Sequence, residues 1–332
     1  MPRLRILTWH VHGNYLWYLS HVPHDIFLPV KPGRPPGYGG RGATFTWPDN
    51  VHEVAAEDVP DLDLDCVLTQ STENWLRDRE EILSPAQMAL PTLHVEHDPP
   101  RDSPTDTRHP IDDADVLLVH VTAFNDLMWD SGRTPTRVIE HGVVVPEGVR
   151  YTGELDRGIV VVNGLRRRGR RLGADIFERC RREIPLDLVG MHADESGGLG
   201  EVPPPELAAF IARYRFFFHP IRYTSLGLAA CEAMMLGMPV VALATTEIST
   251  VVENGVSGWI DTDVDRLVDH MKRLLSDADE ARRLGEGARR TALERFSIDR
   301  FVADWDDALQ LVAGEGRRTV EARQPSTVSS RR

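Results

Sequence analysis

One carboxylate lies inside an otherwise apolar helical segment. The segment from Leu228 to Leu236 reads L-A-A-C-E-A-M-M-L, and its acidic residue is Glu232. A buried carboxylate is costly unless a polar group pairs with it. Glu232 could accept hydrogen bonds from a ribose diol, and charge-assisted hydrogen bonds contribute about 1.5–3 kcal/mol each. The alternative is an ion pair with an arginine such as Arg222.

Small and polar residues come directly before this helix. A helix N-terminus at the carboxyl end of a strand presents free backbone N–H groups and the positive end of the helix dipole, so it can bind an anion. The residues that would form this anion site are Thr224, Ser225, Leu226, Gly227 and Leu228. Together with Glu232 they point to a nucleotide-binding site.

An arginine-rich stretch follows an apolar strand in the second half of the chain. It reads V-N-G-L-R-R-R-G-R-R-L-G from Val162 to Gly173. Guanidinium groups suit phosphate because they donate hydrogen bonds in a planar fork. The stretch could contact phosphate, form a solvated helix start or belong to a nucleic-acid-binding patch.

Several histidines follow strands in the first half. His97 comes just after the strand predicted at Thr92–Val95. The carboxyl ends of strands in an open α/β sheet face the ligand crevice, so His97 could contact a substrate, or it could cap its loop. His10 and His12 alternate after the first strand. Two histidines without a carboxylate are weak evidence for a metal site, and we predict none.

Strands and helices alternate in both halves of the chain and would position these residues. Apolar runs predict strands at 4–9, 25–30, 66–69, 92–95, 116–121, 137–139, 158–162, 186–189, 216–218 and 240–243. They predict helices at 15–19, 173–182, 205–214, 228–236, 264–275, 278–294 and 300–312. The Gly- and Pro-rich segment 31–48 is expected to be a binding loop or disordered. The alternation predicts an α/β protein with two doubly wound, Rossmann-like domains that face each other across a cleft.

The composition is that of an ordinary globular protein, with 332 residues, 41% of them apolar and 27% charged. The net charge is −13, and residues 1–150 hold 12 basic and 23 acidic residues, a net charge of −11. An acidic first half disfavours nucleic acid and anionic lipid as partners. The sequence shows no membrane-spanning run, no signal-peptide pattern, no zinc spacing and no disulfide framework. We therefore expect a cytoplasmic protein without an integral membrane segment.

The region from His219 to Ile260 resembles the retaining family 4 glycosyltransferases, which have the GT-B fold. The shared motifs are Gly227-Leu228, Glu232-Ala233-Met234, Gly237-Met238-Pro239-Val240-Val241 and Asn254-Gly255-Val256-Ser257-Gly258. The resemblance continues through the C-terminal helices and covers most of residues 137–312, whereas the first half is less similar.

The resemblance implies roles for the candidate residues. Glu232 would bind the nucleotide ribose and His97 would act as the catalytic residue that contacts the transferred sugar. Gly13 would lie in a glycine loop that closes over the donor phosphates. The implied donor-binding residues are Gly13, Arg166, Arg168, Thr224, Ser225, Leu226, Gly227, Leu228 and Glu232.

The chain departs from the family at two positions of the donor site. Thr224 stands where the family has its first motif glutamate, so the position carries a hydroxyl in place of a charge. Gly164 stands where the family has an arginine that helps hold the donor diphosphate. Arg168 would bind the diphosphate, with Arg166 or Arg170 compensating for the missing cation.

The implied protein is a metal-independent glycosyltransferase that moves a sugar from a nucleoside diphosphate-sugar to an acceptor hydroxyl, with retention of configuration and without a cofactor. Two alternatives remain. One is a GT-B sugar-nucleotide enzyme that is not a transferase, such as an epimerase or phosphorylase, and the other is a catalytically inactive nucleotide-sugar-binding protein.

The resemblance also implies how the chain is divided. We expect an N-terminal acceptor domain over 1–145, a C-terminal nucleotide-sugar-binding domain over 146–298 and a helix over 299–313 that crosses back to the first domain. The polar, aperiodic residues 314–332 are expected to form a disordered tail. The assembly is expected to be a monomer or a dimer.

Overall fold

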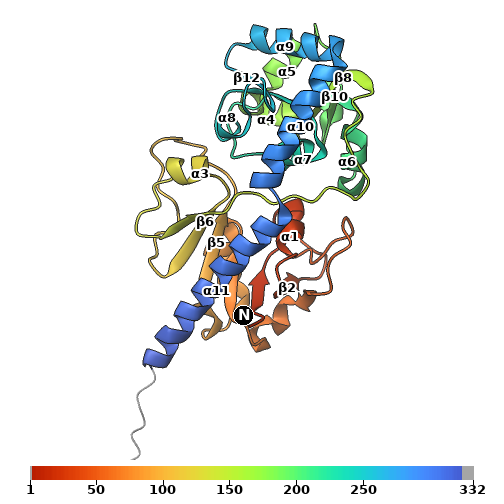
Figure 1. The fold of residues 1–332 in the computed structure, drawn as a ribbon. Helices are drawn as coiled ribbons and strands as arrows, with labels where there is room; N and C mark the ends of the chain where they lie inside the picture. The colour runs from red at the N-terminus through yellow and green to blue at the C-terminus, as the bar shows by residue number, and fades with distance from the viewer. Residues whose placement is uncertain (1, 324–332) are drawn as a thin grey trace, which may run out of the picture.

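Two parallel β-sheets organise the chain, one in each half (Figure 1). The computed structural model describes residues 2–323. The first sheet has seven strands in the order β3-β2-β1-β4-β5-β6-β7, and the second has five in the order β12-β11-β10-β8-β9. The prediction of two doubly wound α/β domains is therefore confirmed.

The N-terminal domain carries the seven-stranded sheet. Its strands are β1 (Arg5–Thr8), β2 (Asp25–Val30), β3 (Val51–Ala55), β4 (Cys66–Thr69), β5 (Thr92–Glu96), β6 (Val116–His120) and β7 (Thr136–Val138). Its helices and helical turns are α1 (Gly13–Leu19), η1 (Ala56–Asp61), η2 (Asn74–Asp78), α2 (Arg79–Ile82), η3 (Gln87–Ala89) and α3 (Ala123–Met128). All residues of β4 are buried, as expected for a central strand covered on both faces. The sequence analysis missed β3, an edge strand whose V-H-E-V-A run is only partly buried.

The C-terminal domain carries the five-stranded sheet. Its strands are β8 (Leu155–Val161), β9 (Leu186–Val189), β10 (Tyr214–His219), β11 (Val240–Leu243) and β12 (Gly258–Asp261). Its helices and helical turns are α4 (Leu165–Arg168), η4 (Gly169–Leu172), α5 (Ala174–Cys180), η5 (Ala193–Ser196), α6 (Pro204–Ile211), α7 (Leu228–Leu236), α8 (Ile248–Val251), α9 (Val264–Ser276) and α10 (Ala278–Arg295). Strand β12 was not predicted, because its residues are mostly half-buried and lack an apolar run.

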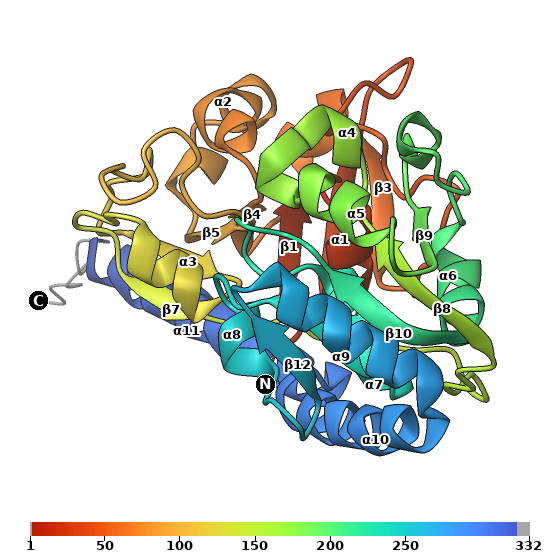
Figure 2. The ribbon, with the colours of Figure 1, turned by 90° about the horizontal axis from the view of Figure 1, so that it is seen from above.

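The strand β10 shows how the second sheet is sandwiched between helices. Successive side chains of a strand point to opposite faces. Phe216 and Phe218 pack into the core that includes residues of α5 and α9, whereas Phe217 packs into the core of α7 and α10. In Figure 2 the helix α9 lies along the strands β10 to β12. A strand buried on both faces reads as a continuous apolar run, as this one does.

The helix α11 (Ile298–Arg323) leaves the C-terminal domain and lies along the N-terminal domain (Figure 1). Its Trp305 is fully buried and donates a hydrogen bond from Nε1 to Tyr15 Oη at 3.1 Å. Gly142 allows Phe301 of this helix to approach the interdomain connection, because a Cβ at Gly142 would lie 2.2 Å from the Cβ of Phe301.

The structure differs from the expectation of a disordered tail that begins at 314. The helix α11 continues to Arg323, and residues 324–332 lie outside the described part of the chain. Helices propagate readily once they are nucleated, and the segment 315–323 is rich in Arg, Glu and Ala, which favour helix. The boundaries between the two domains stay predictions.

Candidate functional site

Both sheets have a point at which the strand order reverses, and the predicted site residues follow the strands at these points. In the first sheet the reversal lies between β1 and β4, and in the second between β8 and β10. Open α/β sheets bind ligands outside the carboxyl ends of the strands at such switch points. The fold thus brings together the turn after β1, the arginine-rich stretch after β8 and the loop after β10.

A cavity of about 550 Å³ opens between the two domains at this place. Its lining comes from the turn after β1 on one side, and from α7 and the segments after β8 and β10 on the other. The predicted site residues that line it are Gly13, Arg168, Thr224, Gly227, Leu228 and Glu232. The predicted site residues outside its lining are His97, Arg166, Ser225 and Leu226.

Glu232 is almost completely buried, with 9% of its surface exposed, and its side chain reaches the cavity. Its Oε1 accepts a hydrogen bond of 2.7 Å from the hydroxyl of Tyr18, which belongs to α1 of the opposite domain. Burial raises the pKa of Glu232 above its ordinary value, and the hydrogen bond from Tyr18 opposes this shift. The alternative partner Arg222 pairs instead with Asp175, at 2.6 Å between Nη1 and Oδ1.

The helix α7 begins at Leu228 and has no side-chain cap. Gly227, its N-cap residue, lines the cavity with Leu228, so the free N–H groups of the first turn lie beside the empty space. Ser225 and Leu226 are buried and support this loop from behind. The carbonyl of Leu226 accepts a hydrogen bond of 2.8 Å from His141 Nε2 in the interdomain connection.

The structure separates the two arginines that were assigned to the donor diphosphate. Arg168 lines the cavity. Arg166 turns away from it, because its guanidinium donates to the carbonyl of Glu195 in η5 at 2.9 Å. Arg166 is therefore not a cavity residue, although it lies two positions from Arg168.

Sequence reasoning missed a different arginine of the same stretch. Arg170, the other candidate, is exposed and pairs with Asp175 at 2.6 Å. Arg171 is half-buried, and no residue within 2–323 forms a hydrogen bond or an ion pair with its side chain. Burial lowers the pKa of Arg171, and the charge of Arg171 contributes to a lowered pKa at Arg168, so the two cations are neighbours. Which arginines of such a run face the same side depends on the local turn η4, whose geometry the residue types do not reveal.

His97 lies behind the turn that lines the cavity. Its ring centroid is 4.3 Å from that of His12 and 4.6 Å from that of Tyr15, and both of these residues line the cavity. Its Nε2 is buried and has no hydrogen-bond partner within residues 2–323. Burial, with a contribution from His12, lowers the pKa of His97 well below its usual value. The imidazole is therefore neutral and can serve as a hydrogen-bond donor or acceptor.

Gly13 begins α1 and lies close to His10. A Cβ at Gly13 would be 3.0 Å from His10 Nε2, so glycine permits this approach. His10 directs its Nδ1 to the carbonyl of Gly40 in the segment 31–48, while the ring of His12 packs against that of His97 at an interplanar angle of 59°. The two histidines that alternate in sequence thus have separate partners.

His94, Glu96 and His109 place their ligand atoms within 4.8 Å of one another in the N-terminal domain. The backbone N–H of Ile111 donates to His109 Nδ1 at 3.1 Å, so the ring proton of neutral His109 is on Nε2. That Nε2 lies 3.2 Å from Glu96 Oε2 and donates to it. His109 and Glu96 are therefore paired with each other, whereas His94 Nδ1 lies 2.7 Å from Thr69 Oγ1, outside the cluster.

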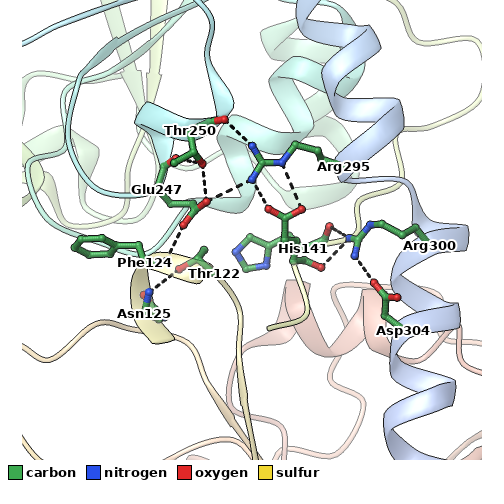
Figure 3. A network of polar contacts seen from close by, with 10 residues as sticks. Thr122, Phe124, Asn125, His141, Glu247, Thr250, Arg295, Arg300 and Asp304 are labelled. Carbon is green, nitrogen blue, oxygen red and sulfur yellow. Dashed lines mark hydrogen bonds and ion pairs between the residues drawn. The ribbon is translucent and has the colours of Figure 1, made fainter. Parts of the chain in front are cut away.

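A second polar network joins the two domains (Figure 3). Glu247 is buried, and its Oε2 accepts a hydrogen bond of 2.9 Å from the backbone N–H of Phe124 in the first turn of α3. Its Oε1 accepts from Thr250 Oγ1 at 2.7 Å and from Arg295 Nη2 at 3.4 Å. Arg295 also pairs with Glu140, which lies in the interdomain connection. The network therefore holds α3, the connection and α10 together.

Part of the C-terminal domain is similar to a known protein family. Residues 193–291 match the family model of the glycosyl transferases group 1. Over 125 residues the chain is 39% identical to the MMP alpha-(1->4)-mannosyltransferase of Mycolicibacterium hassiacum, an alignment that covers 36% of this chain and 30% of that protein. The matched region thus spans less than a third of the length of this relative.

Solved structures extend the similarity to both domains. Sucrose-phosphate synthase of Thermosynechococcus elongatus superimposes with a TM-score of 0.66 at 18% identity, over 97% of this chain and 100% of that chain. HepE of Anabaena in complex with UDP superimposes with a TM-score of 0.66 at 13% identity, over 93% of this chain and 100% of that chain. A glycosyltransferase of Rickettsia africae superimposes with a TM-score of 0.63 at 12% identity, over 94% of this chain and 99% of that chain.

None of the helices within residues 2–323 combines the length and the apolar character needed to span a bilayer. The predicted resemblance and fold are confirmed by the family match and by the superpositions. Residues 193–291 of the C-terminal domain thus match the glycosyl transferases group 1 family, and the two sheets of the chain form the GT-B fold.

Proposed function

We propose that this protein is a glycosyltransferase that binds a nucleoside diphosphate-sugar in the interdomain cavity and transfers the sugar to an acceptor hydroxyl with retention of configuration. The observation that carries the proposal is the buried carboxylate of Glu232 in one cavity with Arg168 and the N-terminus of α7. A diol-binding acid and two features that attract anions are what a nucleoside diphosphate requires. Because of the family match, we expect the diphosphate to carry a sugar, which is the group that is transferred.

Each group has a defined task in this proposal. Glu232 accepts hydrogen bonds from the ribose, and the diphosphate lies between the backbone N–H groups at Gly227 and the guanidinium of Arg168. Arg171 supplies the second cation in place of the arginine that is missing at Gly164. His97 contacts the sugar through its unpaired Nε2. We retain Ser225 and Leu226 as residues that shape the loop and withdraw Arg166 from the donor-binding set.

The resemblance to the retaining glycosyltransferases implies the reaction that this site would carry out. The acceptor hydroxyl attacks the anomeric carbon on the face from which the diphosphate departs. The bond from carbon to phosphate oxygen breaks, the new glycosidic bond forms, and the acceptor proton passes to the departing phosphate oxygen. The protein contributes orientation and stabilises the negative charge on the leaving diphosphate, which requires no bound metal.

A thermal-shift screen of nucleoside diphosphates and their sugars tests the proposal. The wild-type protein is expected to be stabilised by at least one of them, because a ligand that binds only the folded state raises the unfolding temperature. The variant Glu232→Ala is expected to lose this shift. Glu253→Ala, which removes an exposed carboxylate of the same domain, serves as the control and should keep it. An unchanged thermal shift in Glu232→Ala would show that the ribose does not bind at Glu232.

Thr224 favours a second candidate function, a nucleotide-sugar-binding protein without turnover. The position carries a hydroxyl where the family has a glutamate, and Thr224 lines the cavity. Incubation with the donor alone and with a panel of acceptors separates the candidates. A transferase releases the nucleoside diphosphate slowly by hydrolysis and faster with an acceptor, an epimerase or phosphorylase yields an epimer or a sugar phosphate, and a binding protein leaves the donor intact.

A further inference from the structure

A tyrosine of the N-terminal domain reaches the carboxylate that we assign to the ribose. The hydroxyl of Tyr18 donates to Glu232 Oε1 at 2.7 Å, although the two residues are 214 positions apart in the sequence. Both are buried, with 5% and 9% of their surfaces exposed. The hydrogen bond therefore crosses the interface between the domains in a region from which most solvent is excluded.

Tyr18 is held in place by the helix that carries it. In α1 the side chains of Tyr15, Leu16 and Leu19 are buried in the core of the N-terminal domain, and this fixes the orientation of Tyr18. Burial raises the pKa of Tyr18 well above its usual value, and the nearby Glu232 carboxylate raises it further. The hydroxyl consequently keeps its proton and acts as a hydrogen-bond donor to Glu232.

Glu232 retains acceptor capacity after it has bonded to Tyr18. A carboxylate offers about four acceptor positions. Within residues 2–323 Tyr18 is the only group that donates a hydrogen bond to the Glu232 side chain. Because Glu232 also lines the cavity, the remaining positions are available to a ligand there. A glutamate has three rotatable side-chain bonds, and the hydrogen bond from Tyr18 removes part of that freedom before any ligand arrives.

We infer that Tyr18 is a positioning residue for the donor nucleotide, which holds the Glu232 carboxylate in the orientation that accepts hydrogen bonds from the ribose. The inference rests on the proposed function and assigns to the N-terminal domain a part in nucleotide recognition. The nucleotide would contact Glu232 on the C-terminal domain, but the geometry of that contact would be set from across the cleft. Ribose recognition is then strongest when the two domains are in the arrangement that brings Tyr18 to Glu232.

The test is a comparison of ribose recognition in Tyr18→Phe and in the wild type. Dissociation constants are measured by calorimetry for UDP, GDP and ADP and for their 2′,3′-dideoxy analogues. The ratio between each pair reports the contribution of the ribose hydroxyls. The wild type is expected to prefer the ribonucleotide by about tenfold or more, since each charge-assisted hydrogen bond contributes about 1.5–3 kcal/mol. In Tyr18→Phe the preference should fall at least threefold, whereas affinity for the dideoxy analogue should change little.

Tyr223→Phe provides a matched control. The hydroxyl of Tyr223 also crosses the domain interface, where it donates to the carbonyl of Pro100 at 2.8 Å, but it does not touch Glu232. A loss of ribose preference in both variants would mean that any weakening of the interface suffices, and it would overturn the specific role of Tyr18. If Tyr18→Phe does not fold, the same comparison is made between Glu232→Gln and the double variant Tyr18→Phe/Glu232→Gln. In both of these variants the buried side chain at position 232 is neutral.

The outcomes distinguish this inference from the proposed function. If the wild type binds none of the three diphosphates, the proposed function fails and the inference fails with it. If the wild type binds and prefers the ribonucleotide but Tyr18→Phe keeps the full preference, only the inference fails. A stronger preference in Tyr18→Phe would also overturn it, because Tyr18 would then compete with the ribose for Glu232.

Discussion

His97 has a buried ring nitrogen, Nε2, that has no hydrogen-bond partner among the described residues. Arg171 is a half-buried neighbour of the cavity residue Arg168, and no hydrogen bond or ion pair joins its side chain to another described residue. Buried polar groups are nearly always paired, so unpaired ones need an explanation. For Glu232 the sequence already carried the signal, since an acid in an apolar helix is conspicuous. For His97 the signal was its place after β5. Arg171 had no signal of its own, because five of the six residues from 166 to 171 are arginine.

His97→Ala is expected to separate donor binding from turnover. The neutral imidazole would contact the sugar and not the nucleotide, so the dissociation constant of the donor should change by about twofold at most. Release of nucleoside diphosphate from the donor should slow by about a hundredfold, the lower range for loss of a positioned catalytic group. His52→Ala, which removes a histidine on the edge strand β3, is the control. Wild-type turnover in His97→Ala would exclude His97 from the site.

Arg171→Ala tests the second cation of the diphosphate site. Affinity for a nucleoside diphosphate is expected to fall about tenfold, the equivalent of about 1.4 kcal/mol and close to one charge-assisted hydrogen bond. Affinity for the matching nucleoside without phosphate should not change. Arg167→Ala removes a neighbouring arginine that pairs with Glu195, and it should leave both affinities intact. Equal losses for the diphosphate in the two variants would indicate a general effect of charge and not a contact.

At the scale of elements, the loop between β11 and α8 ties the two domains together. Thr246 has a φ of +52°, which is unusual for a β-branched residue. The next residue, Glu247, accepts the backbone N–H of Phe124 in α3 of the other domain. The position after a strained residue therefore carries an interdomain contact (Figure 3).

Glu247→Ala is expected to weaken the connection between the domains. The change leaves the N–H of Phe124 without its acceptor and deprives Arg295 of one of its two carboxylate partners. Loss of charge-assisted hydrogen bonds in a buried place should cost about 2 kcal/mol of unfolding free energy, which denaturant titration measures. Glu253→Ala, at an exposed position of the same segment, should cost less than about 0.5 kcal/mol. Equal stabilities would contradict the role of Glu247.

The elements could be predicted from the sequence where apolar periodicity is strong. The positions of β10 and α7 were predicted closely, because F-F-F is typical of a buried strand and a glycine such as Gly237 is typical of a helix end. In the structure Gly237 ends the helix with a φ of +92°. The edge strands β3 and β12 were missed because pairing with a neighbour, and not burial, defines them. Tyr18 and Glu247 were beyond sequence reasoning for a similar reason. Their partners lie in the other domain, and no local pattern encodes a contact across 214 or 123 positions.

At the scale of the whole molecule, buried histidines make stability depend on pH. Burial is the main cause that lowers the pKa of His120, His141 and His219 to about 4. His120 faces Asp126 and His109, His141 faces Glu140 and Arg300, and burial lowers the pKa of His219. An unfolded histidine titrates near 6.5, so the unfolded chain binds more protons below that pH. Stability contributed by these residues is present above pH 6.5 and is lost as the pH falls towards 4.

The unfolding temperature is therefore expected to fall by several degrees between pH 7.5 and pH 5.5. At pH 5.5 each such histidine costs about 1.4 kcal/mol relative to neutral pH. Carboxylates with lowered pKa values, such as Asp25 and Asp175, lose their contribution only near and below pH 4 and do not act in this window. Glu232, with its raised pKa, acts in the opposite direction but is a single group. An unfolding temperature that is constant from pH 7.5 to 5.5 would contradict this account.

The two domains share one site because each contributes its switch point to the same cavity. The acidic N-terminal half, with its net charge of −11, is a poor match for an anionic acceptor, and Arg168, the arginine that lines the cavity, comes from the C-terminal half. In the proposed function, this division favours the second sheet for the anionic donor and an uncharged or cationic acceptor for the first.

The structure of the complex with the nucleoside diphosphate that gives the largest thermal shift tests the central claim most directly. We predict that the ribose hydroxyls lie within hydrogen-bond distance of Glu232 and that the diphosphate lies beside Gly227 and Arg168. A nucleotide bound elsewhere, for example in the cavity of about 610 Å³ beside Lys31 and Arg34, would contradict it, as would a ribose in the interdomain cavity that does not touch Glu232.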